Sequence, residues 1–251
     1  MIKFFRKIRY NLMEQNKTGK YLKYAIGEIV LVVIGILIAL SINNWNETKK
    51  TRGIELKLLH ELKDDLKETK EDLLTDIEKA NRLLVVTDSL YQAASENNWG
   101  QVKISMDYIY ETPHLFAKLS AYKSIQAFGV NIISNDNLRK MITNFYELHL
   151  ERVQYGESLI KEINEQEIKP YLDDISIPIK HCKDCNSLFE LYNNFENNQK
   201  KIYHVKEANT KLIHLLKEKF KLVNGLLQTR YKDTELQIEN MVNAINKEIV
   251  D

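Results

Sequence analysis

The sequence has 251 residues, of which 36 are basic and 35 acidic, so the formal net charge is only +1 at pH 7. The charge is unevenly placed, because residues 1–24 contain seven basic residues and one acidic residue, while the part beyond Trp45 is mildly acidic. That acidic part argues against a nucleic acid partner, since phosphate binding needs concentrated positive charge. The chain has only 8 Gly and 3 Pro, well below average usage, which predicts long uninterrupted helices.

Residues 1–24 form a basic segment at the start of the chain. Apolar residues such as Ile2, Phe5 and Ile8 fall on one helical face, and the basic residues lie largely off it. Such a segment can lie along an anionic membrane surface or simply fix the orientation of a following membrane helix. We expect it to be a cytoplasmic juxtamembrane segment.

The apolar run from Ala25 to Ile42 predicts a transmembrane helix over residues 25–45. Its 21 residues would span about 31 Å as an α-helix, close to the thickness of a bilayer's hydrocarbon core. Tyr24 and Trp45 stand where aromatic rings settle at the two membrane interfaces. Glu28 lies about one turn inside the border, where it is either an interfacial residue or a contact for a membrane partner.

The orientation of this helix follows from its flanks. Lys and Arg are in excess before the apolar run, which predicts that the N terminus is inside and the bulk of the chain outside. The alternative is a cleaved secretory signal, because Ala39, Leu40 and Ser41 offer small residues at a plausible cleavage site. The basic region is long for a signal peptide, so we expect an uncleaved anchor.

Residues 46–251 predict an all-α domain, an elongated antiparallel bundle of about four helices, two of them long and coiled-coil-like. The first long helix ends near Asn97 and is a possible continuation of the membrane helix, with Gly53 as the one candidate break. Its apolar positions follow heptad spacing: Leu59, Leu62, Leu66, Thr69, Leu73, Ile77, Ala80 and Leu84.

The following elements are predicted from caps and spacing. Thr112 and Pro113 have the chemistry of a helix start, which predicts a helix from Pro113 to Phe128 with Gly129 as its stop. Asn135 or Asp136 caps a helix over residues 137–167. The second long helix is expected over residues 199–249, antiparallel to the first.

Cys182 and Cys185 are the only cysteines in the chain. Outside the cytoplasm they are expected to form a disulfide that closes a short loop. A zinc site would draw on His181 as well, but it lacks an evident fourth ligand. A thiol oxidoreductase would need a strand-and-helix scaffold, for which the sequence has no pattern.

The sequence offers no grouping typical of catalysis. HExxH and GxSxG motifs are absent, and Glu111 with His114 is an isolated match to a carboxylate-histidine pair. Aromatic residues around Tyr122 and Phe145 are dense enough to line a pocket but are more typical of a core. We therefore expect no catalytic residue, no cofactor site and no metal site.

Two stretches resemble a known family. Residues 4–47, FFRKIRYNLMEQNKTGKYLKYAIGEIVLVVIGILIALSINNWNE, and residues 121–148, AYKSIQAFGVNIISNDNLRKMITNFYEL, are similar to uncharacterised single-pass membrane proteins common in Bacteroidota, which carry a domain of unknown function. The resemblance implies a bacterial inner (cytoplasmic) membrane protein with a cytoplasmic N terminus and a periplasmic helical domain. It brings no assigned activity and no functional residues.

These observations predict a membrane-anchored periplasmic scaffold or protein-interaction module without catalytic activity. Its expected partners are the lipid bilayer and another envelope protein, or a second copy of the chain. The alternative is a small-molecule-sensing helical bundle that signals through a membrane partner. A thiol redox enzyme that uses Cys182 and Cys185 is a third hypothesis.

Overall fold

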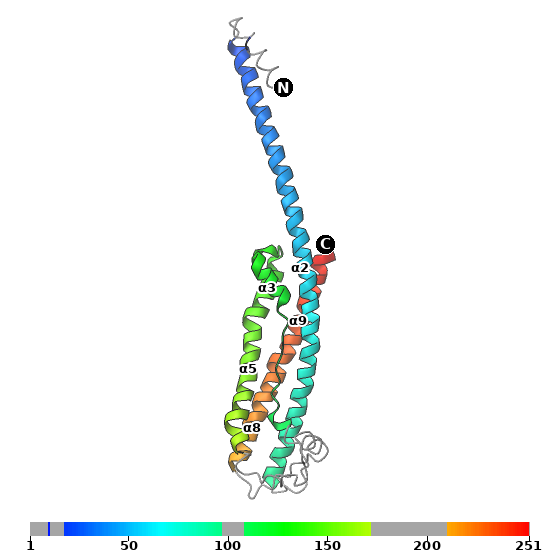
Figure 1. Cartoon of the computed structure of the whole chain (residues 1–251), viewed down its shortest axis with the longest axis vertical. Helices are drawn as coiled ribbons and strands as arrows, with labels where there is room; N and C mark the ends of the chain where they lie inside the picture. Colours follow the sequence, from blue (N-terminus) through cyan, green and yellow to red (C-terminus); the bar gives the residue numbers. More distant parts are fainter. Residues whose placement is uncertain (1–9, 11–17, 97–107, 172–209, 251) are drawn as a thin grey trace, which may run out of the picture. The chain divides into compact units, whose positions relative to one another are not determined.

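The computed structural model describes residues 10, 18–96, 108–171 and 210–250 (Figure 1). The chain divides into two compact units, Met1–Leu56 and Lys57–Asp251. Cys182 and Cys185 lie outside the described residues, as do residues 199–209 of the predicted last helix. The predicted disulfide therefore stays a prediction.

The first unit contains the start of helix α2, which runs from Thr18 to Glu96. Over the predicted membrane span its apolar side chains are exposed, as Leu37 (57%) and Ile38 (55%) illustrate. In the described part of the chain, α2 is the one helix long and apolar enough to cross a membrane, a property that a signal sequence shares. The helix does not break at Gly53, so the predicted continuation beyond the apolar run is confirmed.

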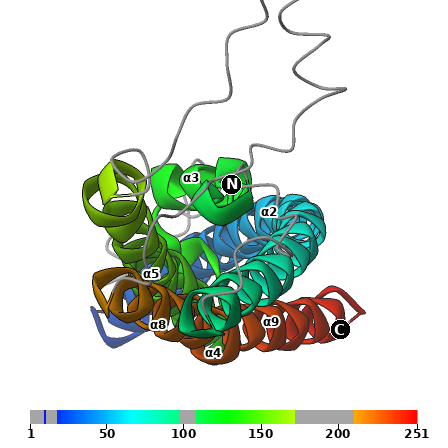
Figure 2. The ribbon, with the colours of Figure 1, turned by 90° about the horizontal axis from the view of Figure 1, so that it is seen from below.

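The second unit is an all-helical bundle, and no strand occurs in the described ranges. Besides α2 it contains the short helix α3 (Ser120–Phe128) and two long helices, each with π-helical turns. One long helix comprises α4 (Asp136–Asn144), η3 (Phe145–His149), α5 (Leu150–Glu162) and η4 (Ile163–Ile168). The other comprises α8 (Thr210–Gly225), η5 (Leu226–Tyr231) and α9 (Lys232–Val250). Figure 2 shows these helices from one end of the bundle.

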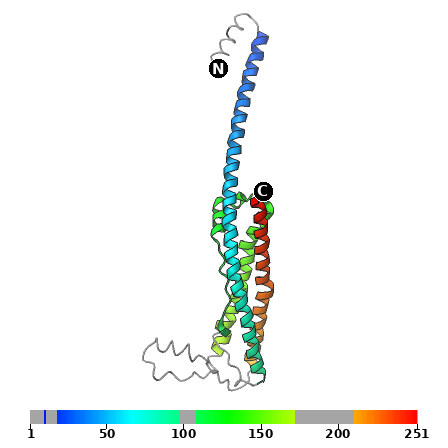
Figure 3. The same cartoon turned by 90° about the vertical axis from the view of Figure 1, so that its right-hand side faces the viewer.

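The first and last long helices pair in antiparallel fashion (Figure 3). Lys70 of α2 contacts Glu239 of α9 at 2.5 Å. Further along α2, the ring centroid of Tyr91 lies 5.4 Å from the ammonium of Lys217 in α8. Contacts nearer the C-terminal end of α2 are thus made with residues nearer the N-terminal end of the last long helix. The predicted antiparallel pairing is confirmed.

The heptad positions of α2 face the core of its own chain. Leu59, Leu62, Leu66 and Leu73 are completely buried, and each buried leucine contributes about 1.5–3 kcal/mol. They pack with apolar side chains from the other helices: Tyr122, Ile142, Phe145, Tyr146, Val153, Val223, Leu227, Tyr231 and Ile238.

One predicted helix is partly wrong. Residues 111–119 are extended, and α3 begins only at Ser120 instead of Pro113. The two predicted boundaries that follow are correct: Gly129, at the end of α3, has a positive φ of 88°, and the Asn135 side chain caps α4 by accepting the backbone N–H groups of Asn137 and Leu138. The reason for the extended conformation lies in its contacts.

Candidate functional site

The segment 111–119, here called the strap, runs from the 3-10 turn η1 (Tyr108–Tyr110) to α3 (Figure 1). Over residues 113–116 its side chains alternate as in a β-strand. Pro113 and Leu115 are buried, whereas His114 and Phe116 are exposed. The strap is thus a single extended segment inside a helical bundle.

Three side chains on one face of α2 accept hydrogen bonds from backbone N–H groups of the strap and of the start of α3. Asp72 Oδ2 accepts the N–H of Phe116 at 2.8 Å, and Thr69 Oγ1 accepts the N–H of Lys118 at 3.0 Å. Asp65 accepts the N–H of Ala121 at 2.8 Å. Because these N–H groups are bound to α2, those of Phe116 and Lys118 are not available for helical hydrogen bonds, which explains the extended conformation.

Glu157 of α5 binds the strap from the opposite side. Its Oε1 accepts the N–H of Leu115 at 2.9 Å and the hydroxyl of Tyr231 at 2.8 Å, and its Oε2 lies 2.9 Å from His114 Nδ1. Burial raises the pKa of the Glu157 carboxyl, and these hydrogen bonds oppose the rise. The carboxylate is almost fully buried, but it is well supplied with donors, as a buried charge must be.

A lysine binds the turn η1 before the strap, and an asparagine binds both that turn and the start of the strap. Lys219 of α8 is completely buried and donates to the Ile109 carbonyl and to Asn164 Oδ1, the latter at 2.6 Å. Burial lowers the pKa of Lys219 to about 7, although nearby Glu111 raises it. Asn164 Nδ2 completes the contact by donating, at 3.2–3.3 Å, to the Tyr110 and Glu111 carbonyls and to Thr112 Oγ1. Thr112 therefore is not a helix cap.

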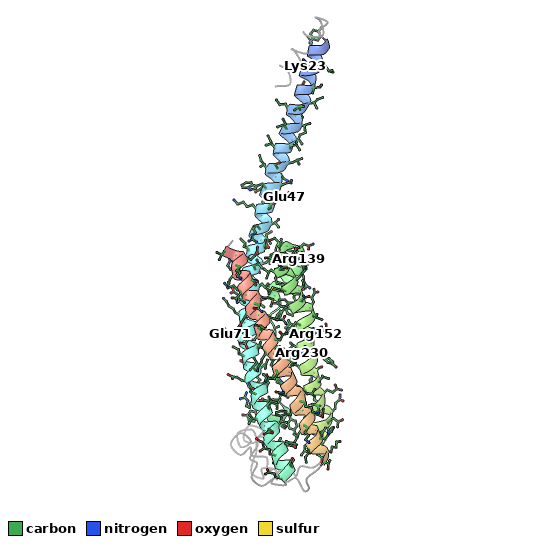
Figure 4. The ribbon with its side chains drawn as sticks, turned by 180° about the vertical axis from the view of Figure 1, so that it is seen from behind. Lys23, Glu47, Glu71, Arg139, Arg152 and Arg230 are labelled. Atoms are coloured by element: carbon green, nitrogen blue, oxygen red, sulfur yellow. The ribbon has the colours of Figure 1, made fainter. Side chains whose placement is uncertain are left out.

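A third buried polar group joins η3 to α9. Thr234 donates its hydroxyl to the Arg230 carbonyl, so the 2.7 Å contact of Thr234 with His149 Nε2 requires that this nitrogen carries the proton. Gln237 donates to His149 Nδ1 at 2.9 Å, so the ring is neutral. Burial lowers the pKa of His149; Asp233 opposes this, and Arg230 and Arg152 add to it. Figure 4 labels both arginines at this junction of the two long helices.

Each of the three π-helical turns in the described ranges contains one of these polar residues. His149 ends η3, Asn164 lies in η4 and Tyr231 ends η5. A π-turn shifts the register of a helix by one residue and is frequent at functional sites. The π-turns therefore direct polar side chains into the core, at positions where a regular α-helix would place apolar side chains.

The sequence contained a signal for part of this site. Lys219 lies between Leu216 and Val223, at a spacing where the apolar stripe of the helix predicts another apolar residue. Glu157 likewise lies between Val153 and Ile160. A charged residue at such a position must find buried partners. Glu157 finds them at the strap, and Lys219 at the turn η1 before it and at Asn164.

The residues selected from the sequence lie elsewhere. Glu28 is partly exposed on α2 and Trp45 is 66% exposed, with the Lys49 ammonium 5.5 Å from its ring centroid. The two are 17 residues apart, about 26 Å along the helix, so they do not form one site. The Tyr24 side chain is outside the described part. Where residues are described, no three His, Cys, Asp or Glu side chains are placed to hold a metal ion.

Comparison with known proteins gives one match. Residues 28–170 match the model of a family of unknown function (DUF6090), more than half of the chain. The matched range includes the strap, α3, α4 and α5 but not α8 or α9. No curated protein matches the chain, and no solved structure does so either.

Proposed function

The chain belongs to the DUF6090 family, whose function is unknown, and we propose from its geometry that it is a membrane-anchored helical module that binds another envelope protein without catalysing a reaction. The proposal places the apolar run of α2, residues 25–45, in the inner membrane of a bacterium, with the N terminus in the cytoplasm and the bundle in the periplasm. The apolar run of α2 and the basic residues before it support this placement. The aromatic ring of Trp45 would lie at the outer interface.

One observation carries the binding role: Phe116 is an exposed aromatic residue on a fixed backbone. Its side chain is 68% exposed and meets the His114 ring edge-on at 4.4 Å. Its own N–H is bound by Asp72, and the neighbouring N–H of Leu115 by Glu157. An aromatic side chain that is ordered before binding loses little conformational entropy on binding, which is typical of residues that dominate interfaces.

The contacts of the buried polar groups support binding over catalysis. Glu157, Lys219 and Asn164 are of residue types that a catalytic site would use, but Glu157 and Asn164 are occupied in holding the strap and Lys219 in holding the turn η1 that precedes it. Their geometry serves to fix a backbone conformation. The module would therefore present a rigid surface to its partner.

A photoreactive phenylalanine analogue placed at position 116 tests this role in intact membranes. We expect a discrete crosslinked product, and we expect much less of it when Asp72→Ala removes the acceptor for the Phe116 N–H and loosens the backbone beneath the ring. The analogue at Leu236, which is 55% exposed on α9, is the matched control. If position 116 gives no more product than position 236, the proposal is wrong.

Sensing is the second candidate function, and Lys219 favours it. A buried amine with a pKa of about 7 changes its charge near neutral pH, and this amine binds the turn η1 from which the strap starts. The bundle would then report a change in its surroundings through the strap to a membrane partner. Equal protection factors for amide exchange in the strap at pH 6 and pH 8.5, each relative to the intrinsic rate at that pH, in wild type and in Lys219→Met, would exclude this role for protons.

A further inference from the structure

Two carboxylates lie beside the part of the strap that carries the exposed Phe116 ring. Asp72 of α2 binds the N–H of Phe116, and Glu157 of α5 binds the N–H of Leu115 from the opposite side. An ionised carboxylate accepts hydrogen bonds and donates none, so each adds negative charge next to the ring. The surroundings of Phe116 are therefore negative.

Two lysines lie near Asp72 but are paired with other carboxylates. The pKa of Lys79 is raised mainly by its hydrogen bond with Asp76, and that of Lys118 mainly by its hydrogen bond with Glu68; Asp72 adds a smaller contribution to both. The two ion pairs measure 2.9 Å and 3.0 Å. In the part of the chain that the structure describes, Asp72 has no ion pair and accepts a hydrogen bond through Oδ2 alone. Its Oδ1 is thus free to accept from a partner.

His114 presents a second free acceptor next to the ring. Its Nδ1 lies 2.9 Å from Glu157 Oε2, and because an ionised carboxylate only accepts, Nδ1 carries the proton of the neutral imidazole. Nε2 then has a lone pair, and it has no hydrogen-bond partner within the described ranges. The His114 side chain is 51% exposed, and its ring centroid lies 4.4 Å from that of Phe116.

An aromatic ring, an unpaired carboxylate oxygen and an imidazole nitrogen together favour a cation. The face of an aromatic ring attracts positive charge, and a carboxylate forms its strongest hydrogen bonds with charged donors. A guanidinium suits this set better than an ammonium, because its planar fork stacks on a ring and donates in more than one direction. A neutral donor would leave the charge of Asp72 uncompensated. The chemistry of the surface therefore selects arginine.

We propose that an arginine side chain of the partner stacks on the Phe116 ring and donates to Asp72 Oδ1 and His114 Nε2. This inference rests on the proposed function and deepens it, because it names the group of the partner that Phe116 receives. Asp72 then uses its two oxygens for two purposes. Oδ2 holds the backbone of the strap, and Oδ1 binds the arginine.

Nuclear magnetic resonance of the full-length chain in detergent, with ring-labelled phenylalanine, tests the site before the partner is identified. The probe is N-acetyl-arginine amide, and its control is N-acetyl-citrulline amide, which has nearly the same shape but no charge. Phe116→Leu assigns the Phe116 signal by its loss. We expect the arginine probe to shift this signal in a saturable manner, with at least fivefold higher affinity than the citrulline probe. Equal responses to the two probes, or no response to either, would refute the site.

Asp72→Asn separates the charge of Asp72 from its hold on the backbone. The asparagine oxygen still accepts the N–H of Phe116, but the charge is gone, so the arginine probe should bind at least fivefold more weakly. Glu71→Gln removes the neighbouring charge at an exposed position of α2 and should leave the affinity at the wild-type level. Unchanged affinity in Asp72→Asn would overturn the inference.

The photoreactive analogue at position 116 separates this inference from the proposed function. The crosslinked product should decrease in Asp72→Asn as it does in Asp72→Ala. If it decreases only in Asp72→Ala, the partner requires the fixed backbone but not the charge, so the proposed function stands and the arginine site is refuted. No product above the control at position 236 would refute the proposed function itself.

Discussion

Tyr231 donates its hydroxyl proton to Glu157 across 2.8 Å in the core of the bundle. The same carboxylate oxygen accepts the N–H of Leu115, so one buried oxygen joins the last long helix to the strap through α5. Desolvation raises the pKa of Glu157, and the Tyr231 hydrogen bond is one of the interactions that limit the rise. The stability of this junction therefore depends on pH.

Tyr231→Phe should destabilise the bundle by about 1–3 kcal/mol, the usual effect of removing a hydrogen bond to a charged group. Because the folded-state pKa of Glu157 is raised, its contribution to stability is lost as pH rises through that pKa. Removing the hydroxyl raises the pKa further, so the loss should be larger at pH 8 than at pH 5. Denaturant unfolding of the full chain in detergent measures it, with Tyr155→Phe, 65% exposed, as the control. An equal loss of stability at pH 5 and pH 8 would contradict the raised pKa of Glu157 and its hydrogen bond with Tyr231.

Thr69→Val keeps the shape of the side chain but removes the acceptor for the N–H of Lys118. Thr69 is 1% exposed, so the N–H is left without its partner, and a loss of about 1–3 kcal/mol is expected. Thr75→Val on the exposed face of α2 removes only a local bond to the Glu71 carbonyl and should change stability by less than about 0.5 kcal/mol. Faster amide exchange in the strap of Thr69→Val alone would locate the effect. Similar stability in both variants would show that α2 does not hold the strap.

Local signals predicted the helices well, because the elements concerned are specified by neighbouring residues. The heptad leucines of α2, the positive φ at Gly129 and the Asn135 cap are all within a few residues of what they control. The strap could not be predicted in this way. Thr112 and Pro113 favour a helix start, but the groups that bind Phe116 and Lys118 lie 44 and 49 residues earlier in the chain.

Only part of the candidate site could be predicted from the sequence, for the same reason. Lys219 and Glu157 stand out as charges on apolar stripes, but their partners are carbonyls and N–H groups of a distant segment. No residue type marks such backbone groups in a sequence. The π-turns at His149 and Tyr231 also change the helical register locally, which a count of 3.6 residues per turn does not include.

His149 should make the bundle sensitive to acid. Its pKa is lowered from 6.5 in the folded state, so the unfolded chain binds the proton first and stability is lost as pH falls below 6.5. His149→Gln, which still reaches Thr234, should lose less stability than wild type between pH 7.5 and pH 5. His60→Gln, at an exposed site on α2, should keep the wild-type profile. Unfolding by denaturant across this range measures the slopes, and parallel profiles for all three proteins would refute the role of His149.

Lys219→Met removes an amine whose burial favours the neutral form. Because the folded-state pKa falls from 10.5 to about 7, the charged lysine destabilises the fold increasingly as pH drops from about 10 to 7, and by a constant amount below that. The stability of the variant relative to wild type should therefore rise by a few kcal/mol between pH 9.5 and pH 6.5. Thermal unfolding of the two proteins measures this difference, with Lys221→Met, 70% exposed, as the control. A difference that does not depend on pH would show that Lys219 is not desolvated.

Gly156 of α5 lies directly against Leu226 of η5. A Cβ atom there would lie 3.0 Å from Leu226 Cδ1, so Gly156→Leu should force the helices apart and cost about 1–3 kcal/mol. Gly225 is also helical, but a Cβ atom there meets nothing within 4 Å, so Gly225→Ala should stabilise the helix by about 0.5–1 kcal/mol. Denaturant unfolding should show a lower free energy of unfolding for Gly156→Leu and a higher one for Gly225→Ala. Since Glu157 follows Gly156 directly, Gly156→Leu should also speed amide exchange at Leu115, and unchanged exchange there would show that the strap does not depend on this helix contact.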